Sequence, residues 1–235
     1  MKRFVAAMGH LNIDLIYGRM PRIPAEGEEV FSESLDLELG GGPAATLVNL
    51  HRLGIEAQLG TFLGRDFLSE FARRELDSYG LPYLNFFRGE GSPLTVTSII
   101  STESDRTFVS HAFDEEGYAI PESELYELYR GCSVAYIGLG YDEVWRRLKR
   151  EGAAIVLDSH WREDLSLGLY EEAFGYVDYF TPNQKEAERI TGESDPRRSI
   201  ELLAERVASP VVKLGAEGCL YREGGRTRHA PALRD

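Results

Sequence analysis

Short apolar runs recur along the chain and predict strands that are buried on both faces. The first, Phe4–Met8, ends at Gly9, and similar runs follow at residues 153–157 and 211–212, with a further expected strand at residues 177–180, where Asp178 is the one charged residue. Uninterrupted apolar runs of this length are typical of strands in a parallel sheet that helices cover on both sides. We therefore expect these segments to form the centre of such a sheet.

Other segments are more polar and predict strands with one solvated face. In residues 30–39, three leucines at alternate positions are separated by acidic side chains. A polar, β-branched stretch at residues 95–102 is joined by a short turn to residues 106–110, which is the pattern of a hairpin. We expect these segments to form a small sheet of their own.

Segments with helical spacing of apolar residues separate the strands, and capping residues mark their ends. Asp66, Asp142 and Asn183 are the expected N-terminal caps, and a glycine often follows the last turn. The expected helices begin near Pro43, Asp66, Asp142, Asn183 and Pro196, and they end near Gly54, Gly80, Gly152, Gly192 and Ala208. Helices that alternate with buried strands predict an α/β fold with a mostly parallel sheet.

The composition is that of a globular protein with an excess of acidic residues. Its 235 residues suffice for one large domain, and Asp plus Glu total 39 against 26 Lys plus Arg, a formal net charge of −13. A charge of this sign repels a polyanion, so nucleic acid is not an expected partner. A small phosphorylated ligand stays compatible with it, because helix N-termini, backbone N–H groups and a bound cation provide local positive potential.

The cysteines and the lengths of the apolar segments restrict the class of protein further. Cys132 and Cys219 are far apart and form no C-x-x-C pair, so we expect neither a disulfide framework nor a zinc site, which suits a reducing cytoplasm. No run approaches the ~18 consecutive apolar residues of a membrane span. These features predict a cytoplasmic protein without a membrane segment.

The first candidate for chemistry follows the first buried strand directly. Ligands of open parallel sheets bind beyond the carboxyl ends of the strands. Asn12 and Asp14 lie there and would offer a donor and acceptor pair and a carboxylate to the hydroxyls of a polyol. The alternative is that both side chains only satisfy backbone groups of a turn.

The second candidate is a run of glycines, residues 40–42, that opens a helix. Gly41 and Gly42 would let the backbone approach a ligand closely, and the helix start presents free N–H groups to oxygen atoms. The same residues fit the G-x-G-x-x-A pattern of a dinucleotide site, although Pro43 stands within it and the preceding strand is amphipathic. A plain tight turn is the remaining interpretation.

The third candidate is Asn183 with Glu186, after the expected strand at residues 177–180. A helix cap followed three residues later by glutamate is a capping box, which has a purely structural role. Both side chains also lie on one face of the first helical turn, where they could hold a hydrated Mg²⁺, an ion that needs few protein carboxylates.

The fourth candidate is the segment from Lys213 to Gly218, in which a buried strand turns at Gly215 and Gly218 into a return strand. Glycines here would let a purine nucleotide lie along the backbone, and the alternative is an ordinary hairpin. Patterns of P-loop enzymes, zinc proteases, esterases and protein kinases do not occur in the sequence.

The order and spacing of these motifs resemble the PfkB family of carbohydrate kinases, which includes ribokinase, over essentially the whole chain. Residues 9–14 resemble the family's first sugar-contacting loop, residues 41–45 followed by Leu53-Gly54 its diglycine signature, and residues 60–66 its G-x-x-G-x-D segment. Asp158 and Arg162 resemble a strand-end pattern of the family, Asn183 and Glu186 its N-x-x-E motif, and residues 213–218 its nucleotide-site strand and turn.

The resemblance implies a single ribokinase-like domain over residues 1–235, with a three-layer core and a small β lid formed by residues of about 16–39 and 93–112. It implies ATP-dependent phosphorylation of a hydroxyl on a sugar or nucleoside, with Mg²⁺, and a homodimer formed through the lid. The implied sugar contacts are Asn12, Asp14, Gly41, Gly42 and Thr46. The implied nucleotide-site residues are Asn183, Glu186, Lys213, Gly215 and Gly218, with Glu186 at the metal.

Two departures from the family pattern bear on function. Thr46 stands where the diglycine signature usually continues with a sugar-binding asparagine, and the sequence contains no G-A-G-D motif. In the family that motif carries the catalytic aspartate and the glycine N–H groups that stabilise phosphoryl charge. We therefore expect the catalytic base to lie beyond Asp235, in an active kinase that this chain represents incompletely. The alternatives are a non-catalytic sugar- or nucleotide-binding protein and, third, an NAD-dependent oxidoreductase that uses residues 40–45.

Overall fold

The computed structural model describes residues 4–112 and 118–233, and the chain divides into two compact units. The N-terminal unit comprises Ala6–Pro121, and the C-terminal unit comprises Glu122–Asp235 together with the first five residues. Strand β1 (Phe4–Met8) begins in the second of these units and continues into the first. The apolar run at this strand is confirmed as a buried strand.

The C-terminal unit is built on a sheet whose strands follow the order β13-β12-β11-β10-β9-β8, with β1 next to β8. The pairs from β8 to β11 are parallel, and β12 and β13 return antiparallel to β11. The strands are β8 (Val134–Ile137), β9 (Ala154–Leu157), β10 (Tyr179–Phe180), β11 (Ser209–Lys213), β12 (Cys219–Glu223) and β13 (Arg226–Ala230).

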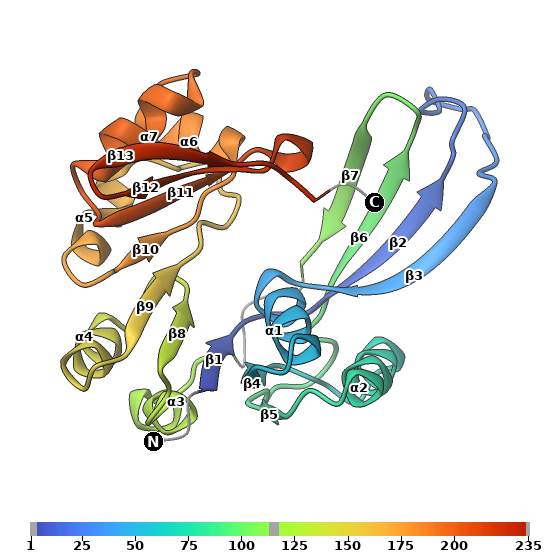
Figure 1. The fold of residues 1–235 in the computed structure, drawn as a ribbon. Helices are drawn as coiled ribbons and strands as arrows, with labels where there is room; N and C mark the ends of the chain where they lie inside the picture. The colour runs from blue at the N-terminus through green and yellow to red at the C-terminus, as the bar shows by residue number, and fades with distance from the viewer. Residues whose placement is uncertain (1–3, 113–117, 234–235) are drawn as a thin grey trace. The chain divides into compact units, whose positions relative to one another are not determined.

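Helices alternate with these strands and bury their apolar faces against the sheet. Helix α4 packs beside β9, and α7 packs beside β11 and β12 with α6 against it, as Figure 1 shows. Ile155, Phe180 and Val212 are fully buried in the resulting core. The helices are α3 (Glu122–Tyr129), α4 (Asp142–Arg150), α5 (Leu167–Phe174), α6 (Gln184–Thr191) and α7 (Pro196–Ala204), and the 3₁₀ turn is η1 (Gly215–Glu217).

The N-terminal unit continues the α/β alternation and adds a second sheet. Strands β1, β4 and β5 are neighbours, with β4 and β5 parallel, and the second sheet has the order β3-β2-β6-β7 (Figure 1). The expected small sheet and its hairpin of β6 and β7 are therefore confirmed. The elements are β2 (Asn12–Gly18), β3 (Ser34–Gly40), α1 (Gly42–Arg52), β4 (Glu56–Thr61), α2 (Phe67–Tyr79), β5 (Tyr83–Asn85), β6 (Thr95–Ser101) and β7 (Arg106–His111).

Local signals decide where several helices begin and end. Asp66 accepts hydrogen bonds from the backbone N–H groups of Leu68 (3.0 Å) and Ser69 (3.1 Å), which caps α2 as expected. Gly80 ends the same helix in the left-handed conformation, with a φ of 67°. Among the described residues no helix combines the length and the apolar character needed to cross a bilayer.

Two sequence predictions were wrong in detail. Tyr141 precedes α4 with a φ of 59° and caps it without a side-chain bond, whereas the Asp142 carboxylate accepts a hydrogen bond from Tyr176 Oη (2.8 Å). The strand expected at residues 177–180 is limited to its last two residues. Asp178 lies just before these two residues: its backbone N–H donates to Ile155 O (2.9 Å), but its side chain, in place of a backbone carbonyl, accepts the N–H of Ile155 (2.8 Å).

Candidate active site

Polar side chains from three strands gather on one face of the small sheet and form what we call the β2 cluster: Asn12, Asp14, Thr97 and Ser110. The Asn12 amide donates to Asp14 Oδ1 and lies 3.1 Å from Thr97 Oγ1, which in turn lies 2.9 Å from Ser110 Oγ. Thr97 on β6 is the register partner of Asp14 on β2 and also of Ser110 on β7. Strand pairing therefore brings together residues that are far apart in sequence.

Asn12 and Asp14 were expected in a loop, and the structure places them in β2 instead. They are two residues apart in a strand, so their side chains point to the same face. Asn12 pairs with Gly40, and Asp14 pairs with Glu38 on β3. The extended backbone fixes the carboxylate and the amide in one orientation, which a flexible loop would not do.

The Asp14 carboxylate is half-buried, and two effects disfavour its ionised form. Burial raises its pKa, and the negative charge of Glu38 on the neighbouring strand raises it further. An ionised carboxylate that is only partly solvated gains from new hydrogen-bond donors. Hydroxyl groups of a bound polyol would supply such donors.

Glycines are required where β3 passes into α1. A Cβ at Gly40 would lie 2.6 Å from Asp14 Oδ2, and Gly41 has a φ of 106° with a Cβ position 2.6 Å from His10 O. Gly41 caps α1 without any side-chain hydrogen bond, so the N–H groups of the first turn are open to ligand oxygens. Gly42 begins the helix and is exposed.

Thr46 lies one turn further along α1, on the same face as Gly42. It is half-buried, and its hydroxyl makes no side-chain hydrogen bond within the described residues. The strand before this helix, β3, pairs antiparallel with β2. A dinucleotide fingerprint instead needs a parallel βαβ unit, so the setting of residues 40–45 does not favour the oxidoreductase alternative.

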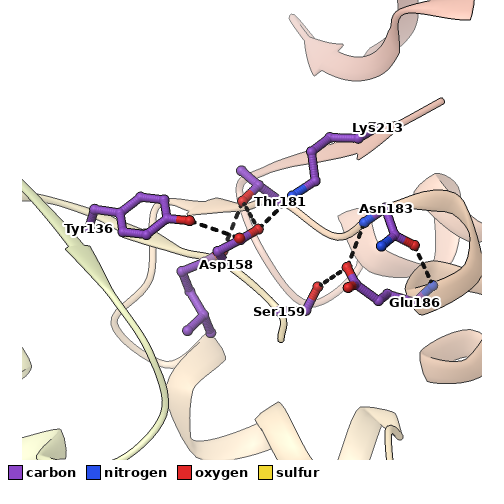
Figure 2. Close-up of polar contacts among 8 residues, drawn as sticks. Tyr136, Asp158, Ser159, Thr181, Asn183, Glu186 and Lys213 are labelled. Carbon is purple, nitrogen blue, oxygen red and sulfur yellow. Dashed lines mark hydrogen bonds and ion pairs between the residues drawn. The ribbon is translucent and has the colours of Figure 1, made fainter. Parts of the chain in front are cut away.

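The C-terminal unit gathers a second polar group, the strand-end cluster, which consists of Tyr136, Asp158, Thr181 and Lys213 (Figure 2). Asp158 Oδ1 accepts hydrogen bonds from Thr181 Oγ1 and Lys213 Nζ, both at 2.8 Å, and Oδ2 accepts one from Tyr136 Oη at 2.8 Å. The Asp158 side chain is 12% exposed and that of Lys213 is 47% exposed. Half of the lysine surface thus stays accessible to a ligand.

Parallel register explains why these residues meet. Leu157 pairs with Phe180, which pairs with Pro210, so that β9, β10 and β11 end at the same edge of the sheet. Lys213 continues beyond this level, and its backbone N–H donates to Pro182 O (2.9 Å) beside Asn183. Ligand sites of parallel sheets lie at this edge.

Asn183 and Glu186 form the expected capping box at the start of α6. Glu186 N donates to Asn183 Oδ1 (2.9 Å), and Asn183 N donates to Glu186 Oε2 (2.8 Å). Ser159 Oγ donates to the same Glu186 oxygen (2.7 Å), as Figure 2 shows. Glu186 is only 5% exposed. Within the described residues its other oxygen, Oε1, accepts no hydrogen bond.

The turn after Lys213 depends on its two glycines. Gly215 and Gly218 have φ values of 60° and 95°, and Leu214 N donates to Gly218 O (2.8 Å) across the turn. A Cβ at Gly218 would lie 2.6 Å from Ala232 N and would also collide with Ala230 O. The backbone of this turn therefore comes close to the segment after β13, and the expected return strand is β12, which pairs antiparallel with β11.

Sequence reasoning gave no site role to Asp158, Thr181 or Thr97. Asp158 carried a signal, because it follows the apolar strand β9 directly. Thr181 and Thr97 carried none, since a threonine next to a strand end or within a strand is ordinary until its register partners are known. Arg162, the other residue of the strand-end pattern, pairs with Asp164 through bonds of 2.8 and 2.9 Å.

Comparisons with known proteins identify the family. The family model described as pfkB family carbohydrate kinase matches residues 2–235. The chain belongs to the PfkB family of carbohydrate kinases. As a PfkB protein it is 23% identical to a ribokinase of Haemophilus influenzae, in an alignment that covers 97% of this chain and 77% of the relative. It is 28% identical to a 1-phosphofructokinase of the same organism, with 88% of this chain and 69% of that protein covered.

Solved structures support the fold of this PfkB protein. A ribokinase from Giardia lamblia matches with a TM-score of 0.79 at 17% identity, covering 99% of this chain and 76% of that one. A ribokinase from Arabidopsis thaliana, solved with ribose and ATP, matches with a TM-score of 0.75 at 19% identity, covering 99% and 79% of the two chains. The expected ribokinase-like α/β fold is thereby confirmed.

Proposed function

We propose that this PfkB protein takes part in the transfer of the terminal phosphoryl group of ATP to a hydroxyl of a sugar or sugar-like small molecule. The observation that carries the proposal is the family match over residues 2–235, which includes the residues of both polar clusters. Such a transfer depends on positioning and on electrostatic stabilisation more than on covalent chemistry by the protein. The roles below follow from what each side chain can do.

The β2 cluster is proposed to bind the acceptor. The Asp14 carboxylate would accept hydrogen bonds from two hydroxyls, and the Asn12 amide, which Thr97 and Asp14 hold in place, would present its remaining donor and acceptor positions. Backbone N–H groups at Gly41 and Gly42 would contact acceptor oxygens. Thr46 offers one hydroxyl where the family pattern has an amide, so it would shift the preference among sugars.

The strand-end cluster and the turn after it are proposed to bind the nucleotide. Lys213 Nζ and Thr181 Oγ1 both donate to Oδ1 of Asp158. Because about half of the Lys213 side chain is still exposed, its ammonium group can donate to a phosphate oxygen as well. Gly215 and Gly218 would let the nucleotide lie against the backbone. The negative net charge of the chain makes such a local cation necessary for a triphosphate.

A magnesium ion fits Asn183 and Glu186 only through water. The described residues hold no group of three or more potential metal-ligating side chains, and Glu186 Oε2 and Asn183 Oδ1 are used in the capping box. The remaining Glu186 oxygen suits a water of a hydrated ion, because Mg²⁺ keeps several waters in most protein sites. When bound, the ion would neutralise phosphate charge. We propose this role for Glu186.

We assign no catalytic base among residues 1–235, so binding is the first test. Purified protein is titrated calorimetrically with pentoses, hexoses, their phosphates and nucleosides, each with and without ATP and Mg²⁺. We expect saturable binding of at least one alcohol and of Mg·ATP, and Asp14→Ala should abolish the first without loss of fold, since it removes no core contact. Unchanged alcohol affinity in Asp14→Ala would show that the acceptor site lies elsewhere.

Release of ADP in the same samples separates two versions of the proposal. Release that depends on the bound alcohol indicates a working kinase. Binding of both ligands without any ADP release indicates a non-catalytic binding protein of the same fold. If neither an alcohol nor ATP binds, the proposed function is wrong.

We also propose that the small sheet pairs two copies of the chain. Its face opposite the β2 cluster carries Leu35 and Leu37 on β3 and Val109 on β7, all of them exposed, with Leu35 at 61%. Clustered exposed apolar side chains on a sheet face are typical of a protein interface. Light scattering coupled to size exclusion measures the mass in solution, and a monomer at high protein concentration would contradict this proposal.

A further inference from the structure

A hollow of about 740 Å³ opens in the N-terminal unit. Two segments form it: residues 63–66, between β4 and α2, and Asn85 at the end of β5 with residues 87–91 after it. Arg73 on α2 completes the lining. None of its residues belongs to the β2 cluster or to the glycines that open α1.

The walls of the hollow are fixed by side-chain bonds to the backbone. Asn85 accepts the N–H of Leu63 (2.9 Å) and donates to Leu63 O (2.8 Å), which ties the two loops together. Arg73 Nη2 donates to Gly64 O (2.6 Å). Gly64 leaves no room for a Cβ, because Pro93 Cδ would lie 2.9 Å away. The cavity is thus preformed and does not depend on side-chain rearrangement.

The lining is cationic in a protein of net charge −13. It contains Arg65, Arg73 and Arg88 against Asp66 and Glu90. Asp66 stays ionised: burial alone would raise the pKa of this carboxyl, but hydrogen bonds from Ser69 and Ser92 lower it overall and occupy its oxygens. By formal charge the three arginines exceed the two acidic residues of the lining by one.

Two of the guanidinium groups have donors to offer. Arg65 has no hydrogen bond or ion pair within the described residues, and Arg73 uses only Nη2, on the carbonyl oxygens of Leu63 and Gly64 in the loop before α2. A guanidinium binds a carboxylate or phosphate through two parallel N–H donors. Arg65 and Arg73 both line the hollow, so their unused donors are the candidates for binding such a group there.

We propose that this hollow binds a small oxyanion, such as the phosphate or carboxylate group of a metabolite, with Arg65 and Arg73 as its ligands. The anion belongs either to a phosphorylated acceptor or to a separate effector. The site stands on its own geometry and does not rest on the kinase activity proposed above.

The test measures thermal stability against inorganic phosphate at constant ionic strength, with chloride as the balancing anion. We expect a saturable rise in the melting temperature of the wild type, and in Arg65→Gln a loss of affinity of roughly tenfold or more, as removal of a charge-assisted pair implies. Arg74→Gln is the matched control, since it makes the same charge change nearby, on helix α2, at a side chain that is 76% exposed and paired with Glu70. Arg73→Lys keeps the charge but not the paired donors and should also weaken binding.

Three outcomes would overturn the proposal: no saturable response in the wild type, equal losses in Arg65→Gln and Arg74→Gln, or a loss in Lys213→Met with none in Arg65→Gln. The source of the anion is read from a second titration, of a sugar and its phosphate. If Arg65→Gln weakens the sugar phosphate as well as free phosphate but leaves the sugar unchanged, the anion is part of the acceptor; if it weakens free phosphate and leaves both the sugar and the sugar phosphate unchanged, the ligand is a separate effector. Asp14→Ala would remove acceptor binding without changing the free-phosphate response, so a failure of the kinase proposal is distinguishable.

Discussion

Asp14 sits in a position that favours binding over stability. Its carboxylate is half-buried, faces Glu38 on the next strand and has a raised pKa for both reasons. A carboxyl whose folded pKa exceeds its unfolded value stabilises the fold only while it is protonated. That contribution is complete below the unfolded value and is lost as the pH rises through the folded one. Near neutral pH the ionised group therefore opposes folding, which is common for residues kept for function.

Asp14→Asn should separate the two effects. The amide keeps the shape and the acceptor for the Asn12 amide but carries no charge. We expect a higher melting temperature than the wild type at pH 7, a difference that shrinks as the pH falls toward the pKa of Asp14, and a loss of alcohol binding. Calorimetric scans between pH 4 and pH 8 measure this. A variant that is less stable than the wild type at pH 7 would contradict the electrostatic argument.

Glu186 has a structural and a proposed chemical role that one substitution can tell apart. Glu186→Gln retains an oxygen for the bonds from Asn183 N and Ser159 Oγ, and glutamine serves in a capping box as well as glutamate. We expect little change in stability, with Mg²⁺-dependent ATP affinity reduced on the order of tenfold. Titration of ATP with and without Mg²⁺ measures this. Equal affinities for Mg·ATP would leave Glu186 with its capping role alone.

At the scale of elements, the turn between β11 and β12 carries a test of backbone geometry. Gly218 combines a φ of 95° with backbone atoms that a Cβ would strike, whereas Gly224 has a φ of 56° and open space around it. Gly224→Ala should cost roughly 1 kcal/mol, the usual cost of placing alanine at positive φ. Gly218→Ala should cost more, by about 1–3 kcal/mol, because the added methyl forces backbone shifts. Urea unfolding compares the two, and equal losses would contradict the close approach of the segment after β13.

At the scale of the whole molecule, the exposed apolar face of the small sheet predicts a dimer, and a charged side chain placed on that face should dissociate it. Leu35→Asp places a carboxylate among exposed apolar side chains, and we expect it to shift the protein from dimer to monomer. Leu53→Asp is the control, because Leu53 is also exposed but follows α1 and lies outside that sheet. Light scattering at matched concentrations measures the mass. Identical masses for Leu35→Asp and the wild type would show that this face is not the interface.

Much of the fold could be predicted because its signals are local. The apolar run at Phe4–Met8, the Asp66 cap and the Gly80 stop each act within one turn or strand, and all three are confirmed. The predictions that were wrong involved competition from distant partners. Asp142 was expected to cap a helix, but Tyr176 Oη binds its carboxylate, and Asp178 replaces a backbone partner of Ile155. Neither partner is visible from the local pattern.

The sequence by itself determined the α/β alternation, the glycines that the β3–α1 junction requires and the residues that mark the family. Only the tertiary structure decided that Asn12 and Asp14 are strand residues, that Thr97 joins them, and that Asp158 collects Tyr136, Thr181 and Lys213. The physical reason is that periodicity and caps are encoded over a few residues. Side-chain clusters instead depend on strand register between segments as far apart as Asp158 and Lys213, which no local pattern specifies.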